Sequence, residues 1–128
     1  MSRAQLLERR RERGRRGRTA GRAAEIVALL LMMIKGYQIL AFRLRTRDGE
    51  IDILARRGGI LAVVEVKQRP TLDEAMAALG PEQTRRLLDA GLSLQATRPG
   101  LRQLALRLQL IALAPGRFPR HVSNLFDG

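Results

Sequence analysis

The pattern of hydrophobic and polar residues along the chain predicts its helices and strands. Two largely apolar runs rich in β-branched residues, 49–55 and 60–67, lie on either side of Gly58-Gly59. Such runs around two glycines are typical of a β-hairpin, because glycine adopts the positive φ angles of a tight turn at little cost. We therefore expect two antiparallel strands, the second of which ends near Gln68.

A long helix is expected before the hairpin. Thr19 can cap a helix that runs to about Lys35 and stops at Gly36. One apolar stripe should face the core, and the second half of this helix is apolar enough to be buried almost all round. The stripe comprises Ala23, Val27, Leu30 and Ile34, and it is widened by Leu29, Met32 and Met33.

Further elements follow from the same patterns. We expect a strand over 37–44, a short helix that starts at 71–74 and ends at Gly80-Pro81, a helix from Pro81 to about Ala96, a strand over 102–114, and a short strand or extended tail over 117–125. The later helix should carry several residues near one face, namely Leu87, Leu88, Gly91, Leu92 and Gln95. The order α-β-β-β-α-α-β-β predicts an α/β (α+β) fold in which helices cover a mixed sheet.

Composition limits the class of protein. A chain of 128 residues with 45% hydrophobic residues forms one globular domain, which we place at 19–128. No cysteine is present, which excludes disulfides and favours a cytoplasmic protein. The longest apolar run, 26–34, is shorter than the about 20 residues that span a bilayer, so no membrane segment is expected.

A net charge of +12 predicts attraction to polyanions, with nucleic acid first. Arginines are densest in residues 1–18, which we expect to form a basic, flexible N-terminal arm. The good helix formers from Ala4 to Arg13 allow this arm to be helical when it is bound. This arm either contacts phosphates or only keeps the protein in solution. Aromatic residues make up 3% of the chain, which leaves little for base stacking, so contacts to the nucleic-acid backbone are favoured over base recognition.

Counting back from the glycine turn places two acidic residues opposite each other. If the residues beside the turn pair, Asp52 lies across from Glu65, and facing side chains have Cβ atoms roughly 5 Å apart. Lys67 follows Glu65 by two residues and projects from the same face. Two carboxylates and an ammonium group therefore meet on an otherwise apolar patch.

Facing carboxylates repel each other, and a divalent cation would remove this conflict. Asp52, Glu65, the Val66 carbonyl and water would form the hard oxygen environment that suits Mg²⁺ or Mn²⁺. Lys67 could then position an attacking water or stabilise charge on a phosphate. Alternatively, Lys67 only pairs with the acids. Only 2 of the 24 basic residues, Lys35 and Lys67, are lysine, and lysine can lose its proton where arginine cannot, which favours a chemical role.

Other polar residues are candidates for contacts to nucleic acid. Gln68 and Arg69 extend past Lys67 towards the end of the sheet, where an arginine can hold a phosphate. Arg85 and Arg86 on the later helix could touch nucleic acid or form ordinary solvated surface. The single histidine, His121, makes no histidine-based zinc site, and at most it caps a strand end or touches a phosphate.

Five segments of the chain resemble a known family. Asp52 followed by Glu65-Val66-Lys67 is similar to the metal-binding motif of the PD-(D/E)xK nuclease superfamily. More narrowly, the chain resembles the bacterial UPF0102 family of small endonuclease-like proteins (YraN-like proteins). The matching segments are Gly21 to Glu25, Gly36 to Leu40, Gly49 to Asp52, Val64 to Arg69, and Pro119 to Val122 with Phe126 after it.

The resemblance implies a restriction-endonuclease-like fold with an αβββαβ core. It also implies that Asp52 and Glu65 are metal ligands, that Lys67 is the catalytic lysine, and that Glu25 is an auxiliary acid. Alternatively, Glu25 lies in the first turn of its helix, where a carboxylate favours the N-terminus electrostatically. Two positions depart from the family pattern: Gln109 replaces the acid of an Arg-Phe-Asp run, and Glu82-Gln83 replaces a lysine-glutamine pair.

Three hypotheses follow. The first is a Mg²⁺- or Mn²⁺-dependent nuclease that hydrolyses phosphodiester bonds in DNA, preferred over RNA, or in structured nucleic acid. The second is a nucleic-acid-binding module of the same fold with weak or no catalysis, suggested by Gln109. The third is a membrane-surface protein, which is disfavoured because the arm lacks an aromatic and leucine face.

Overall fold

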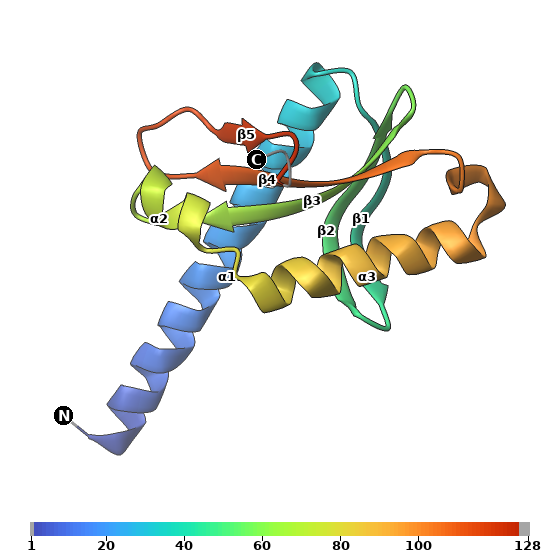
Figure 1. The fold of residues 1–128 in the computed structure, drawn as a ribbon. Helices are drawn as coiled ribbons and strands as arrows, with labels where there is room; N and C mark the ends of the chain where they lie inside the picture. Colours follow the sequence, from blue (N-terminus) through green and yellow to red (C-terminus); the bar gives the residue numbers. More distant parts are fainter. Residues whose placement is uncertain (1, 126–128) are drawn as a thin grey trace.

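The structure is a computed structural model that describes residues 2–125, with the side chains of 7–20 outside the described set. Phe126, the last residue of the family-like pattern, also lies outside the described residues. The elements are α1 (Arg3–Ile34), β1 (Gln38–Thr46), β2 (Gly49–Arg57), β3 (Ile60–Gln68), α2 (Leu72–Ala77), α3 (Pro81–Thr97), a 3-10 turn η1 (Pro99–Leu101), β4 (Ala105–Leu113) and β5 (Arg120–Val122) (Figure 1).

A five-stranded mixed sheet in the order β1-β2-β3-β4-β5 forms the centre of the molecule. All neighbouring strands are antiparallel except β3 and β4, which are parallel and joined through α2 and α3. Helix α1 packs on one face of the sheet and α3 on the other (Figure 1). This arrangement confirms the predicted α/β fold and agrees with a restriction-endonuclease-like core.

The central hairpin forms with the predicted register. Arg57 pairs with Ile60 beside the turn, and Gly58 in the turn has a φ of +56°. A positive φ at the first turn residue explains why glycine is needed there. The outer limits of other strands differ from the prediction: β1 extends to Thr46, β4 begins at Ala105 because η1 precedes it, and β5 is limited to three residues.

Helix α1 begins at Arg3, so the predicted start at Thr19 is wrong. Ser2 caps the helix, because its hydroxyl accepts a hydrogen bond from the Gln5 amide and the Gln5 side chain accepts one from the Ser2 amide. Glu25 therefore lies far inside the helix, and its predicted role in the first turn is also wrong. The division into an arm and a domain stays a prediction.

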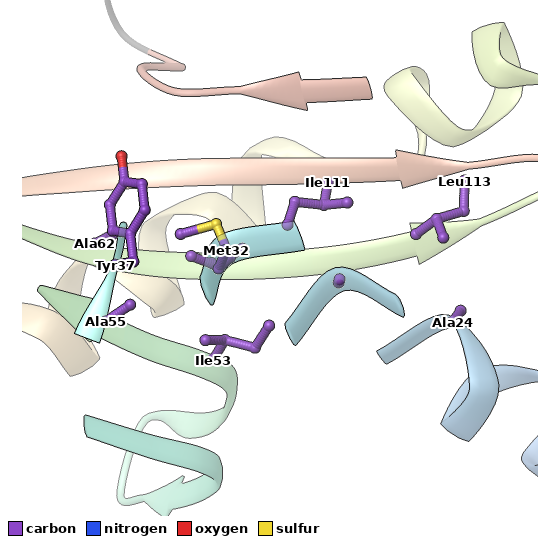
Figure 2. Packing of buried hydrophobic residues seen from close by; sticks show 10 residues of the cluster. Ala24, Met32, Tyr37, Ile53, Ala55, Ala62, Ile111 and Leu113 are labelled. Carbon is purple, nitrogen blue, oxygen red and sulfur yellow. The ribbon is translucent and has the colours of Figure 1, made fainter. Parts of the chain in front are cut away.

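The buried face of α1 also differs from the predicted stripe. Ala24, Ala28 and Met32 are buried, whereas Val27, Leu30 and Ile34 are 42%, 52% and 83% exposed. The buried residues recur every four positions, and the two alanines allow the helix axis to lie close to the sheet. Figure 2 shows Ala24 and Met32 among the sheet residues Ile53, Ala62, Ile111 and Leu113.

The direction of α1 determines where its basic half lies. Ala24 lies near Leu113 at the end of β4, and Met32 lies near Tyr37 and Ala62 (Figure 2). The helix therefore runs antiparallel to β4, and its first half extends beyond the carboxyl ends of β3 and β4 (Figure 1). Residues 3–23 at 1.5 Å per residue correspond to about 30 Å of basic helix projecting from this edge.

Helix α3 packs on the opposite face through Leu87, Ala90, Gly91 and Leu94. Leu92, which the pattern placed near the same face, is 55% exposed. No helix in residues 2–125 is long and apolar enough to cross a membrane.

We expect Gly91→Ala to destabilise the fold by about 1–2 kcal/mol, since overpacking outweighs the gain in helix propensity. A Cβ at Gly91 would lie 2.8 Å from Leu106 Cδ1 and 3.1 Å from Val63 Cγ2. Gly21→Ala in α1 is the matched control, because nothing lies within 4 Å of its Cβ position. Urea denaturation should show opposite signs for the two variants. Equal stabilisation by both would show that α3 does not approach the sheet this closely.

Candidate active site

The candidate site lies where strands β2 and β3 separate. Their backbone pairing runs as far as Ile53 with Val64, and the next two positions in the same register are Asp52 and Glu65. Asp52 Oδ2 accepts a hydrogen bond of 2.8 Å from the Val66 amide, so the side chain of one strand replaces the missing ladder bond. The predicted register is confirmed, and it places the two acids side by side.

Glu65 is the buried acid of the site, with 5% of its surface exposed. Its Oε1 atom lies 3.4 Å from Lys67 Nζ and accepts a hydrogen bond of 3.0 Å from Gln83 Nε2 on α3. Its Oε2 atom is buried and receives no hydrogen bond from a donor among the described residues, although the Asp52 and Glu65 carboxyl groups hydrogen-bond to each other when one of them holds a proton. A buried carboxylate oxygen without a partner is costly, and either a proton shared with Asp52 or a bound cation would remove this cost.

Burial raises the pKa values of both acids, and a side-chain hydrogen bond between them lowers the pKa of Asp52 and raises that of Glu65. Burial, followed by the negative charge of Asp52, raises the pKa of Glu65 to about 7, although Lys67 acts in the opposite direction. Burial also raises the pKa of Asp52, while the Val66 amide opposes the shift and the charge of Glu25 adds to it. Proton uptake is favoured at such a pair unless another cation is bound between the two groups.

The donor set fits Mg²⁺ or Mn²⁺. No cluster of three or more His, Cys, Asp or Glu side chains that could hold a metal is found in the part of the chain that the structure describes. Mg²⁺ does not need such a cage, because it retains several waters and is usually bound by one or two carboxylates together with substrate phosphates. In a β-strand, N–H and C=O of one residue point to the same side, so the Val66 carbonyl also faces Asp52.

Glu25 lies near this pair without joining it. Arg43 Nε donates a hydrogen bond of 2.6 Å to Glu25 Oε2, and the two side chains form an ion pair. Arg43 has a φ of +55°, a left-handed conformation that costs a residue other than glycine about 1–2 kcal/mol. The charge of Glu25 reaches Asp52, but its nearest partner is this arginine.

The predicted contacts to nucleic acid lie at the surface. Gln68 and Arg69 are exposed at the end of β3, and Arg69 Nη1 donates to the Gln68 carbonyl at 2.7 Å. Arg85 is exposed on α3, whereas Arg86 pairs with Glu82 at 2.7 Å. Among these four candidate contact residues, all within the described part of the chain, Arg86 is therefore the one that an ion pair already engages.

Gln83 is the site residue that was absent from the predicted set. The comparison of Glu82-Gln83 with a lysine-glutamine pair placed it in a family-like position, but only the packing of α3 shows that it reaches Glu65. Its amide group occupies Oε1 and leaves Oε2 available. Glu82 is exposed and pairs with Arg86, so the position that departs from the family pattern faces away from the acids.

A family model described as "Uncharacterised protein family UPF0102" matches residues 24–113. The chain belongs to the UPF0102 family. A UPF0102 protein of Caulobacter vibrioides (strain NA1000 / CB15N) is 55% identical over 119 residues, which cover 93% of this chain and 95% of the relative. One from Caulobacter sp. (strain K31) is 56% identical over 112 residues, covering 88% and 81%. One from Chelativorans sp. (strain BNC1) is 47% identical, covering 83% and 86%.

The second departure from the UPF0102 pattern, Gln109, lies on the other face of the sheet. It pairs with Val64, the neighbour of Glu65, and its side chain therefore points towards α1. Its Nε2 donates to the Tyr37 hydroxyl at 3.3 Å, and its Oε1 lies 2.8 Å from His121 Nε2. An acid at position 109 would therefore lie on the opposite face of the sheet, where it could not bind a metal ion together with Asp52 and Glu65.

The contacts of His121 fix its tautomer. Lys35 Nζ lies 2.9 Å from His121 Nδ1 and can only donate, so Nδ1 is the acceptor and Nε2 carries the proton towards Gln109. Burial, followed by the charge of Lys35, lowers the pKa of His121 to about 4. His121 is thus a neutral structural link between β5, β4 and α1.

Proposed function

We propose that this protein is a metal-dependent nuclease of the PD-(D/E)xK type that hydrolyses phosphodiester bonds. One observation carries this proposal: a buried pair of acids has an oxygen, Glu65 Oε2, that receives no hydrogen bond from a donor among the described residues, and a lysine lies beside the pair. Two acids that face each other across a sheet destabilise the metal-free fold, so a role other than fold stability is favoured for this pair.

Each residue of the candidate site would have a separate role in the reaction. Asp52 and Glu65 hold the ion, which when bound would activate water and stabilise negative charge on the phosphate. Gln83 keeps the Glu65 carboxylate oriented by occupying Oε1. Lys67 is 16% exposed, so it can reach the attacking water and still remain beside Glu65. Its amine would accept a proton from that water or neutralise charge on the phosphate.

The distribution of charge supports nucleic acid as the substrate. DNA in preference to RNA is part of the proposal, as is a cytoplasmic location, which the absence of cysteine favours. The net charge is +12, and the arginine-rich first half of α1 projects from the edge at which β3 carries Lys67. Such a helix offers phosphate contacts that weaken steeply with salt. Arg69 and Arg85, both exposed, would add to this surface.

One observation favours the alternative, a binding module without catalysis. Glu25, the acid that the resemblance places near the metal, is held by Arg43. Calorimetric titration with Mn²⁺ separates the two functions: the nuclease hypothesis requires binding that is lost in Asp52→Ala. No Mn²⁺ binding together with salt-sensitive DNA binding would support the module.

Cleavage assays test the nuclease directly. We expect the full chain with Mg²⁺ or Mn²⁺ to cut at least one member of a panel of plasmid, flapped, branched and single-stranded DNA and RNA. Chelation with EDTA and the variants Asp52→Ala and Glu65→Ala should abolish the cut. Activity that persists in both variants would show that another site is responsible.

A further inference from the structure

The connection between β4 and β5 carries an unusually exposed aromatic side chain. Phe118 is 93% exposed, more than any other exposed large hydrophobic side chain among the described residues. The chain contains three phenylalanines, one tyrosine and no tryptophan. A fully exposed aromatic ring presents a face on which a nucleic-acid base can stack.

Two arginines lie on either side of this ring in the sequence. Arg117 and Arg120 line a cavity of about 390 Å³ that Pro70, Thr71, Leu72, Asp73 and Pro115 complete. Within residues 2–125 neither arginine makes an ion pair or a side-chain hydrogen bond, and Asp73 is the single acid of the lining. Two guanidinium groups against one carboxylate leave a net positive cavity that suits a phosphate.

The backbone holds these residues in place. The Arg117 amide donates to the Ala114 carbonyl at 3.2 Å across Pro115-Gly116, and Gly116 has a φ of +70°. Proline followed by a positive-φ glycine is the sequence of a type II turn. Arg120 is anchored by its pairing with Ala112 in β4. The loop is therefore prepared before any ligand arrives.

The loop and the acid pair share one face and one edge of the sheet. Lys67 pairs with Ala112, which pairs with Arg120, so all three project to the same side. Two strand spacings separate Lys67 and Arg120 by about 10 Å. Ala112, which lies between these two residues on the sheet, is buried, so a nucleic-acid strand that reaches both follows the edge of the sheet. At about 3.4 Å per nucleotide, the separation corresponds to at least about three nucleotides.

We propose that the β4–β5 connection binds an unpaired nucleotide of the nucleic-acid substrate. Phe118 stacks on its base, and Arg117 and Arg120 hold the adjoining phosphate. The inference rests on the proposed nuclease function and narrows its substrate to strands with unpaired bases near the cut. A base inside a duplex is stacked on both sides and offers no free face to Phe118.

Binding measurements in EDTA test the loop without any cleavage. The probes are a labelled single strand of about 12 nucleotides, within the range of known site sizes, and the blunt duplex that this strand forms with its complement. We expect Phe118→Ala to weaken binding of the single strand about tenfold and to leave the duplex unchanged. Leu92→Ala, which shortens another exposed apolar side chain, should change neither affinity.

Salt dependence tests the arginines. The double variant Arg117→Ala/Arg120→Ala should reduce the slope of log K against log salt for the single strand by about 1.4, or about 0.7 for each lost phosphate contact. Arg98→Ala is the control, because Arg98 is exposed beyond the carboxyl end of α3, away from Lys67. An equal loss of slope in this control would overturn the proposed site.

Stacking itself can be observed with Phe118→Trp. Because the chain has no other tryptophan, its fluorescence should fall when the single strand binds and stay constant with the duplex. If Phe118→Ala weakens binding to anionic vesicles and leaves the single strand unaffected, the loop is a membrane contact and the proposal is wrong. Stacking without detectable cleavage would contradict the nuclease function and support nucleotide binding by the β4–β5 connection. Cleavage that is unaffected by changes in this connection would support the nuclease function and contradict the nucleotide site.

Discussion

Lys67→Ala should lower the rate of metal-dependent cleavage by about 10²- to 10⁴-fold, the range found for a lost proton-transfer group. This corresponds to about 3 to 5 kcal/mol of transition-state stabilisation. The expectation rests on the position of Nζ, 3.4 Å from Glu65 Oε1. Single-turnover cleavage at saturating protein measures the chemical step, and Mn²⁺ titration shows whether the variant still binds metal.

Two further variants identify what the lysine does. Lys67→Arg keeps the positive charge but cannot release a proton, so it should restore the rate only if Lys67 acts electrostatically. Lys35→Ala removes the only other lysine, which contacts His121 at the carboxyl end of α1, and it should leave the rate unchanged. A Lys67→Ala protein that cuts at the normal rate would reduce this residue to an ion-pair partner.

Glu65→Gln should stabilise the metal-free protein at pH 8 by about 1–3 kcal/mol and have little effect at pH 5. The Glu65 carboxyl has a pKa of about 7 in the fold, against 4.5 ordinarily. Between these values the folded protein holds a proton that the unfolded chain releases. The contribution of this carboxyl to stability therefore falls as the pH rises from 4.5 through 7.

Bound metal should make the wild type more stable than Glu65→Gln at pH 8. Binding between Asp52 and Glu65 stabilises the folded wild type above pH 7, whereas an amide at position 65 is a weak ligand and gains little. Thermal melts at pH 5 and 8, with EDTA or Mg²⁺, measure both effects. Glu74→Gln is the control, because Glu74 is an exposed carboxylate at the start of α2. Equal pH profiles for wild type and Glu65→Gln would indicate that Glu65 ionises as a solvated acid.

The acid pair could be predicted because it depends on local geometry. The hairpin turn at Gly58 sets the register, and the two-residue period of a strand then determines which side chains face each other. The same period placed Lys67 on the face of Glu65. The family resemblance covered the same positions, and the family match at residues 24–113 supports it.

Helix α1 shows where local patterns fail. Hydrophobicity pointed to a stripe through Val27, Leu30 and Ile34 that Met32 widens. Of these four residues the sheet buries Met32, and the other buried positions are Ala24 and Ala28. Burial depends on which face lets the helix approach most closely, and this depends on the partner surface as well as on the helix. The start of α1 was misplaced because the arginine-rich segment has no apolar period, although Ser2 and Gln5 form a capping box.

The sequence by itself determined the strand hairpin, the order of elements and the meeting of Asp52, Glu65 and Lys67, because each depends on neighbours in the chain or across one tight turn. Only the tertiary structure decided that Gln83 from α3 holds Glu65, that Gln109 lies on the opposite face, and that Phe118 and its arginines share an edge with Lys67. These contacts join segments far apart in the chain. The crossover from β3 to β4 and the packing of the helices bring them together, and no local pattern encodes those distances.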